Sequence, residues 1–156
     1  MNSKEQIALI SSIKYRSTED VIPLLENLPI IDIEIRGGTP FVFAVLYEKI
    51  ELVKYLLNRG ANVNALYEGH HPPLMSAVEC KNIELTKLLL EANVDITLRD
   101  KYGNDALFRA VHVVNIDLIK LLVHAGADPF AGEYSAYDSA KDMNAKKVIA
   151  YFDSIR

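Results

Sequence analysis

Histidine and cysteine are the residues of this chain with the most varied potential chemistry. His70 and His71 are adjacent, Cys80 is the single cysteine, and His112 lies further along the chain. A zinc site needs such residues at paired spacings, for example Cys-x2-Cys with His-x3–5-His, and the sequence has no such pattern. Cys80 could act as a nucleophile only beside an oriented base, for which His112 is the positional candidate. Because a lone cysteine is often a small buried hydrophobe, we expect neither a metal site nor a catalytic site.

Carboxylates and glycines provide no second route to catalysis. Glu51, Glu84 and Asp117 recur at regular intervals, which favours a structural or solubilising role, since an acid–base pair need not recur. The seven glycines form no Gly-x-Gly-x-x-Gly or other phosphate-binding loop, and Gly37-Gly38 indicates a turn. We therefore expect a protein that is not an enzyme and holds no cofactor.

The composition is that of an ordinary globular protein with an acidic balance. The chain has 156 residues, of which 50% are hydrophobic and 24% charged, and its formal net charge is −4. Nucleic acids and anionic membranes attract basic surfaces, so we expect neither as a partner. One cysteine suits a reducing compartment, the N-terminus lacks a signal-peptide pattern, and no apolar run approaches the ~20 residues that cross a bilayer. We expect a cytoplasmic protein.

Three sequence markers return every 33 residues in a common register. The pair Leu56-Leu57 returns as Leu89-Leu90 and again as Leu122-Val123. The segment 39–44, which ends in alanine, returns at 72–77 and 105–110, and the segment 50–53 returns at 83–86 and 116–119. A fixed period of this length is typical of a repeat architecture.

The repeating unit resembles the ankyrin repeat, which has a period of 33 residues and the signature Thr-Pro-Leu-His-x-Ala. The first unit has Thr39-Pro40, whereas Pro72 and Asp105 replace the signature threonine in the second and third units. The resemblance implies an all-α solenoid of stacked helix–turn–helix pairs with short β-turn fingers, about ten helices in five pairs. It also implies a single domain over 1–156, with an N-terminal cap at 1–33, repeats at 34–66, 67–99 and 100–132, and a C-terminal cap at 133–156.

The physical chemistry of the unit agrees with this architecture. Thr39 can accept a hydrogen bond from a free N–H group of the first helical turn, as can Asp105 in the third unit. Pro40 and Pro73 suit the first helical position, where no hydrogen bond is lost. The second helix ends at Gly60 and Gly126, which can take a positive φ, and at Asn93, the usual second choice, in the middle unit.

Both ends of the chain contain degraded copies of the unit. We expect Ser3 and Gln6 to form a capping box for the first helix, and Pro23 to shorten or kink the second. At the other end, the marker 135–140 follows the preceding copy by 30 residues, so the last finger is three residues short. Polar residues on these end caps favour a monomer.

In the ankyrin family, the finger tips and the exposed side of each first helix form a concave surface that contacts partners. Tyr and Arg are enriched among residues that dominate binding energy, so Tyr47, Tyr102 and Arg99 are the strongest individual predictions. The resemblance places the partner-binding residues at Arg36, Tyr47, Glu68, His71, Glu79, Arg99, Lys101, Tyr102, Asn104, His112 and Tyr134, with Ile35, Leu46, Leu66, Cys80, Val113, Asp142 and Met143 beside them.

The function implied by the resemblance is a protein–protein interaction module that masks or scaffolds a partner bound on its concave face. Two narrower functions stay open. A small inhibitor or immunity protein that neutralises a toxin or enzyme would use the acidic charge against a basic target. A secreted effector would act on host proteins.

Overall fold

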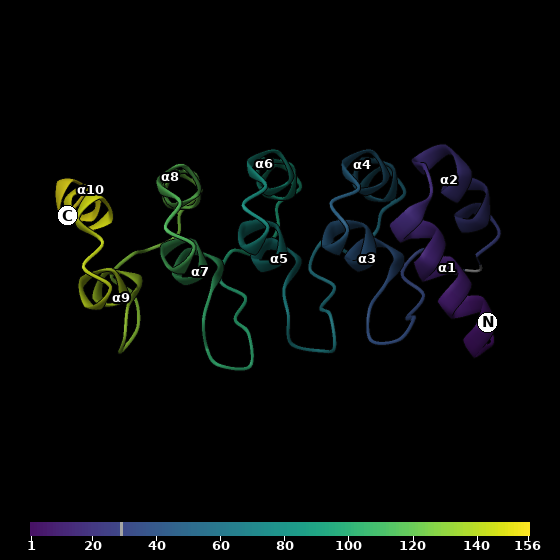
Figure 1. The fold of residues 1–156 in the computed structure, drawn as a ribbon, viewed down its shortest axis with the longest axis horizontal. Coiled ribbons are helices and arrows are strands. Elements are labelled where there is room, and N and C mark those ends of the chain that lie inside the picture. The colour runs from purple at the N-terminus through teal and green to yellow at the C-terminus, as the bar shows by residue number, and fades with distance from the viewer. Residues whose placement is uncertain (29) are drawn as a thin grey trace.

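The computed structural model describes residues 1–28 and 30–156, and the described residues form ten α-helices without a β-sheet. The odd-numbered helices form an inner row and the even-numbered helices an outer row, and the finger loops project from the inner row (Figure 1). The helices are α1 (Ser3–Tyr15), α2 (Thr18–Glu26), α3 (Pro40–Leu46), α4 (Ile50–Asn58), α5 (Pro73–Glu79), α6 (Ile83–Glu91), α7 (Ala106–His112), α8 (Ile116–His124), α9 (Ala136–Asp142) and α10 (Lys146–Ser154).

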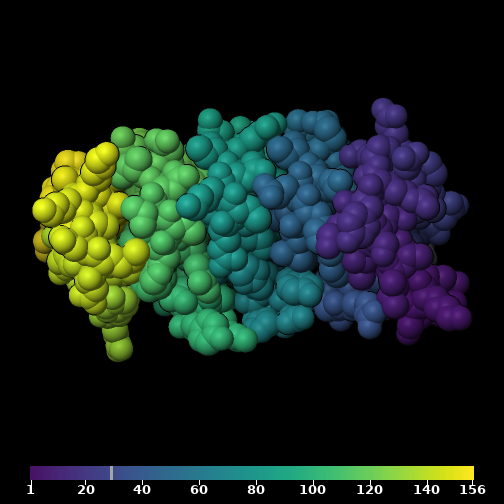
Figure 2. Space-filling model, in the orientation of Figure 1, coloured from purple at the N-terminus to yellow at the C-terminus, as the bar shows by residue number. Residues whose placement is uncertain are grey.

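The helices stack as pairs along one axis. Each inner helix contacts the inner helix of the next pair, from α1 through α3, α5 and α7 to α9, and each pair is also held together internally. The result is one elongated body with the two termini at opposite ends (Figure 2). This arrangement confirms the predicted all-α solenoid. None of the described helices is long and apolar enough to cross a lipid bilayer.

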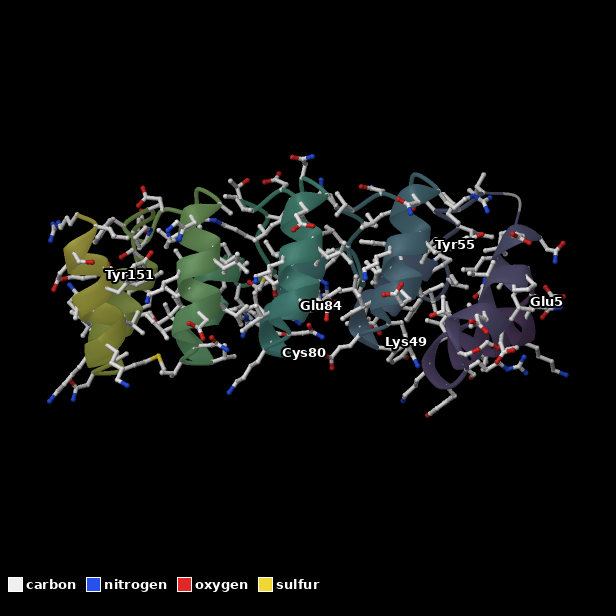
Figure 3. The ribbon with its side chains drawn as sticks, turned by 90° about the horizontal axis from the view of Figure 1, so that it is seen from above. Glu5, Lys49, Tyr55, Cys80, Glu84 and Tyr151 are labelled. Atoms are coloured by element: carbon white, nitrogen blue, oxygen red, sulfur yellow. The ribbon has the colours of Figure 1, made fainter. Side chains whose placement is uncertain are left out.

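The residues that carry the sequence period occupy equivalent environments. Leu56 on α4, Leu89 on α6 and Leu122 on α8 are all fully buried between the two rows. Polar side chains such as Glu84 on α6 lie on the opposite, solvent side of the outer row (Figure 3). The small residues on the inner helices are also fully buried, which lets neighbouring helices approach closely: Ala44, Ala77 and Ala110.

Side-chain caps begin most of the inner helices. Thr39 Oγ1 accepts a hydrogen bond from the backbone N–H of Val42 at 3.3 Å, and Asp105 Oδ1 accepts one from Phe108 at 2.9 Å. Helix α5 begins at Pro73 without a side-chain cap, because Pro72 occupies the cap position. Ser135 caps α9 and stands 30 positions after Asp105, the cap of α7, whereas the repeat period is 33. The predicted shortening of the last finger is therefore confirmed.

Two left-handed backbone positions recur in the repeat. The first ends the outer helix and has φ values of 81° at Gly60, 57° at Asn93 and 102° at Gly126, as predicted. The second lies between the inner and outer helices and has φ values from 50° to 56°. Its occupants differ from one unit to the next: Glu48, Lys81, Val114 and Asn144.

The N-terminal cap differs from the sequence prediction in its helix start. The capping box pairs Asn2 with Glu5, because Asn2 Oδ1 accepts from the N–H of Glu5 at 3.0 Å and Glu5 Oε2 accepts from that of Asn2 at 2.8 Å. The predicted pair of Ser3 with Gln6 was therefore one residue too late. Asparagine is at least as good an N-cap as serine, and a glutamate stands three residues after it.

The prediction that Pro23 shortens the second helix was wrong. Helix α2 continues through Pro23 and has nine residues, the same number as α4. Val21 and Leu25 on either side of Pro23 are buried, and this packing offsets the hydrogen bond that proline cannot make. The outer side of this cap is also less polar than expected, since Ile7 and Leu24 are 45% and 40% exposed. The monomeric state stays a prediction.

Candidate partner-binding surface

The fingers at 34–39, 67–72, 100–105 and 131–135, together with the exposed sides of the inner helices, form what we call the finger surface (Figure 1). Antiparallel bridges close the first two fingers, between Ile35 and Gly38 and between Tyr67 and His71. The third finger is closed by a backbone hydrogen bond from the N–H of Asp100 to the carbonyl of Asn104 at 2.9 Å. The Asp100 side chain reinforces it, because its Oδ1 accepts the backbone N–H groups of Tyr102 at 2.8 Å and Asn104 at 3.0 Å.

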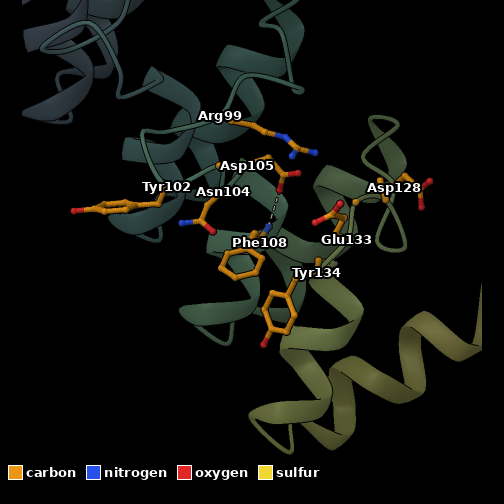
Figure 4. A pocket seen from close by; sticks show the side chains of 12 residues that line it. Arg99, Tyr102, Asn104, Asp105, Phe108, Asp128, Glu133 and Tyr134 are labelled. Atoms are coloured by element: carbon orange, nitrogen blue, oxygen red, sulfur yellow. Dashed lines mark hydrogen bonds between the residues drawn. The ribbon is translucent and has the colours of Figure 1, made fainter.

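A pocket of about 360 Å³ lies between the third finger and the finger of the C-terminal cap (Figure 4). Four residues that the sequence predicted as partner-binding line it. Arg99, Tyr102 and Asn104 come from the third finger, and Tyr134 comes from the cap finger. We call it the third-finger pocket.

Aromatic rings form one side of the third-finger pocket. The ring centroids of Phe108 and Tyr134 are 6.0 Å apart with an interplanar angle of 61°, an edge-to-face pair. The Tyr134 hydroxyl donates a hydrogen bond to Asp142 Oδ2 at 2.8 Å, which fixes the ring and raises the pKa of Tyr134. One wall of the pocket is therefore aromatic, and the position of its Tyr134 ring is fixed by a hydrogen bond.

Charged groups of both signs line the same pocket. Asp105 and Asp128 each use one carboxylate oxygen to accept a backbone N–H at 2.9 Å. Arg99 and Glu133 are exposed and form no ion pair with the part of the chain that the structure describes. Arg99 extends toward the cap finger and Glu133 toward the third finger (Figure 4). Their charges are available to a ligand.

An ionic network of Asp100, Arg109 and Glu79, with His71 at its edge, lies beside the pocket and joins the second and third units. Arg109 Nη2 on α7 contacts Asp100 Oδ2 at 2.7 Å, and its Nε lies 3.2 Å from Glu79 Oε1 on α5. His71 Nε2 is 3.4 Å from the other oxygen of Glu79. The buried Nε of Arg109 has no hydrogen bond of good geometry, so its contact with Glu79 is Coulombic.

The Asp100 side chain is only 4% exposed and is the buried member of this network. Burial alone would raise the pKa of its carboxyl group. Hydrogen bonds from the backbone N–H of Asn104 and from the Arg109 guanidinium outweigh that effect and hold the pKa below its ordinary value. Asp100 is therefore ionised at neutral pH and fixes the shape of the finger that carries Tyr102.

Two family models match this chain. Ankyrin repeats (3 copies) match residues 66–132, and ankyrin repeats (many copies) match residues 41–90. Together the matches span 41–132, more than half of the 156 residues. The chain belongs to the ankyrin-repeat family. A comparison with curated proteins finds no match. Ankyrin repeats are general protein–protein interaction modules, and the family is typically non-enzymatic.

The remaining predicted residues of this ankyrin-repeat protein lie along the finger surface with different degrees of access. Arg36 and Glu68 are exposed at the turns of the first two fingers, both with positive φ. Tyr47 is half-buried against Phe43, with Lys14 Nζ placed 5.4 Å from its ring centroid. Tyr47 is therefore less accessible than the sequence suggested, because the N-terminal cap covers part of it.

At the other end of the ankyrin stack, Lys101 lies with its Nζ 5.1 Å from the ring centroid of Tyr102. His112 is exposed, and its Nε2 is 3.3 Å from Ser139 Oγ. Ile35 is a correction: its side chain is fully buried as part of the bridge that closes the first finger, so it cannot contact a partner.

The histidine and cysteine side chains singled out in the sequence are not gathered into a metal-binding group in the described part of the chain. No group of three or more His, Cys, Asp or Glu side chains there could hold a metal ion. Partial burial and the neighbouring carboxylates of Glu48 and Glu79 raise the pKa of the Cys80 thiol. A raised pKa lowers the fraction of reactive thiolate, the opposite of what a nucleophilic cysteine needs.

Sequence reasoning missed several residues that shape the finger surface. Asp100 and Arg109 organise the third finger, and Phe108, Asp128 and Glu133 line the third-finger pocket. An aspartate at the start of a turn that contains glycine, as in 100–103, is a recognisable signal for Asp100. The other four depend on contacts between neighbouring units, for which the repeat pattern provides no signal.

Proposed function

We propose that this protein binds a partner protein on its finger surface, centred on the third-finger pocket, and acts by masking or scaffolding that partner. One observation carries the proposal. Arg99, Tyr102, Asn104 and Tyr134, which the family resemblance singled out separately, line a single pocket. Tyrosine and arginine are the side chains that most often dominate binding energy in interfaces.

The surface around this pocket is organised before any partner arrives. Asp100 fixes the third finger through two backbone hydrogen bonds, and Asp142 holds the ring of Tyr134. A surface that is already ordered loses little conformational entropy on binding, which favours affinity. A standard interface buries about 1,600 Å² in total, so the partner extends beyond the pocket onto neighbouring fingers.

Substitution of Tyr102 or Arg99 tests this proposal. Both side chains are exposed, Tyr102 to 72%, so Tyr102→Ala and Arg99→Ala should leave the fold intact. We expect each to weaken partner binding by about 1–3 kcal/mol, because each removes a large contact at the centre of the interface. Affinity capture from the source organism with mass spectrometry identifies the partner, and isothermal titration calorimetry with the purified partner measures the loss.

The matched control is Lys87→Ala, which removes a long exposed side chain from α6 in the outer row. This variant should bind the partner as the original protein does. If Tyr102→Ala and Arg99→Ala both retain full affinity, or if Lys87→Ala loses it, the partner does not sit on the finger surface.

A further inference from the structure

Carboxylates outnumber cations in the third-finger pocket. Asp105, Asp128 and Glu133 line it against the single guanidinium of Arg99. Asp105 and Asp128 each keep one carboxylate oxygen beyond the one that accepts a backbone N–H, and Glu133 keeps both. The local charge therefore favours a cationic ligand group, and a negative group would meet net repulsion.

The aromatic wall also favours a cationic ligand group, independently of the carboxylates. Phe108 packs edge to face with Tyr134 and also against His112, whose ring centroid is 4.7 Å away, so Tyr134 provides the more accessible ring of the wall. Tyr134 is 53% exposed, and its hydroxyl is held by Asp142. A planar cation stacks on such a ring, because the ring face carries negative charge density.

Rings and carboxylates together distinguish between the two common cations of proteins. A guanidinium is planar, stacks on rings and donates paired hydrogen bonds to a carboxylate. A lysine ammonium is compact and strongly hydrated, and it makes neither kind of contact as well. Glu133 extends from the cap finger into the same pocket that Tyr134 lines, where its carboxylate can pair with a guanidinium (Figure 4).

We infer that the partner protein inserts an arginine side chain into the third-finger pocket, where it stacks on Tyr134 and pairs with Glu133. This inference rests on the proposed function and names the chemistry of the partner. Arg99 stays at the rim, on the side of the third finger, where Asp105 also lies (Figure 4).

The test uses the full chain and three small probes: the Nα-acetyl N-methylamides of arginine, lysine and glutamate. Each is titrated to millimolar concentration at constant ionic strength while the backbone amide signals are followed by NMR. We expect the arginine compound to shift the amides of Gly103, Gly132 and Tyr134, the lysine compound to do so more weakly, and the glutamate compound not at all. The variant Glu133→Gln should weaken arginine binding about two- to fivefold, the size of an exposed ion pair.

The matched control is Glu84→Gln, which makes the same charge change on the solvent side of α6 (Figure 3). It should leave arginine binding unchanged. The inference is overturned if the glutamate compound shifts the pocket amides more than the arginine compound, if neither shifts them, or if both substitutions weaken binding equally. Those results would leave the proposed function standing as long as Tyr102→Ala still weakens partner binding, so the two claims fail separately.

Discussion

Asp100 makes contacts that hold the third finger and link it to helix α7. Its carboxylate accepts two backbone N–H groups of its own finger and pairs with Arg109 from the adjoining helix. The side chain is almost completely buried, so these contacts are shielded from solvent and salt. The same carboxylate thus holds the conformation of the third finger and forms an ion pair in the network between units.

Asp100→Asn should lower the free energy of unfolding by about 1–2 kcal/mol at neutral pH, because a neutral amide can accept a hydrogen bond from the Arg109 guanidinium but forms no ion pair with it. The pKa of this carboxyl group is lowered in the folded state. Its stabilisation is therefore complete above the unfolded value of about 3.9 and disappears as the pH falls through the folded pKa. Urea denaturation of both proteins from neutral to acidic pH should give stabilities that converge at low pH. A constant difference at every pH would contradict this role.

At the scale of the secondary-structure element, the turn between the inner and outer helices places a non-glycine residue in a left-handed backbone conformation in four units. Glu48, Lys81, Val114 and Asn144 occupy its left-handed position, with φ near 50°. Asparagine tolerates this conformation, whereas a β-branched residue is strained by it. Val114 is also 59% exposed, so its side chain gains little from burial in return.

Val114→Asn should stabilise the protein by about 0.5–1 kcal/mol, because it relieves the strain and removes exposed apolar surface. For a chain of this length the Tm should rise by about 1–4 °C, measurable by differential scanning calorimetry. Substituting Asn144→Val in the last unit provides the reciprocal control and should lower the Tm. An unchanged or lower Tm for Val114→Asn would show that the turn is not strained.

At the scale of the whole molecule, the repeat allowed much of the fold to be predicted from sequence. Helix pairs, the caps at Thr39 and Asp105 and the glycine ends of the outer helices depend on local chemistry that recurs every unit. The pocket and the ionic network depend on contacts between units. Arg109 and Glu79 lie 30 positions apart, and nothing in either unit alone pairs them.

The site was predicted as a surface rather than as a set of contacts. The family resemblance placed Arg99, Tyr102, Asn104 and Tyr134 on one face, and the structure adds that they share a pocket. The family resemblance also placed Ile35 on this face, and that prediction was wrong. The side chain of Ile35 is buried at the bridge that closes the first finger. The N-terminal cap was also harder to predict, because its sequence departs from the repeat pattern. Its first helix is capped by Asn2, and its second helix contains Pro23.

The most direct test of partner binding on the finger surface is hydrogen–deuterium exchange of the protein alone and in complex with its captured partner. We expect the complex to slow exchange in the third finger, 99–104, and in the cap finger, 131–135. Exchange in the outer helices α6 and α8 should stay as it is in the free protein. Slower exchange confined to α6 and α8, with both fingers unchanged, would contradict the account.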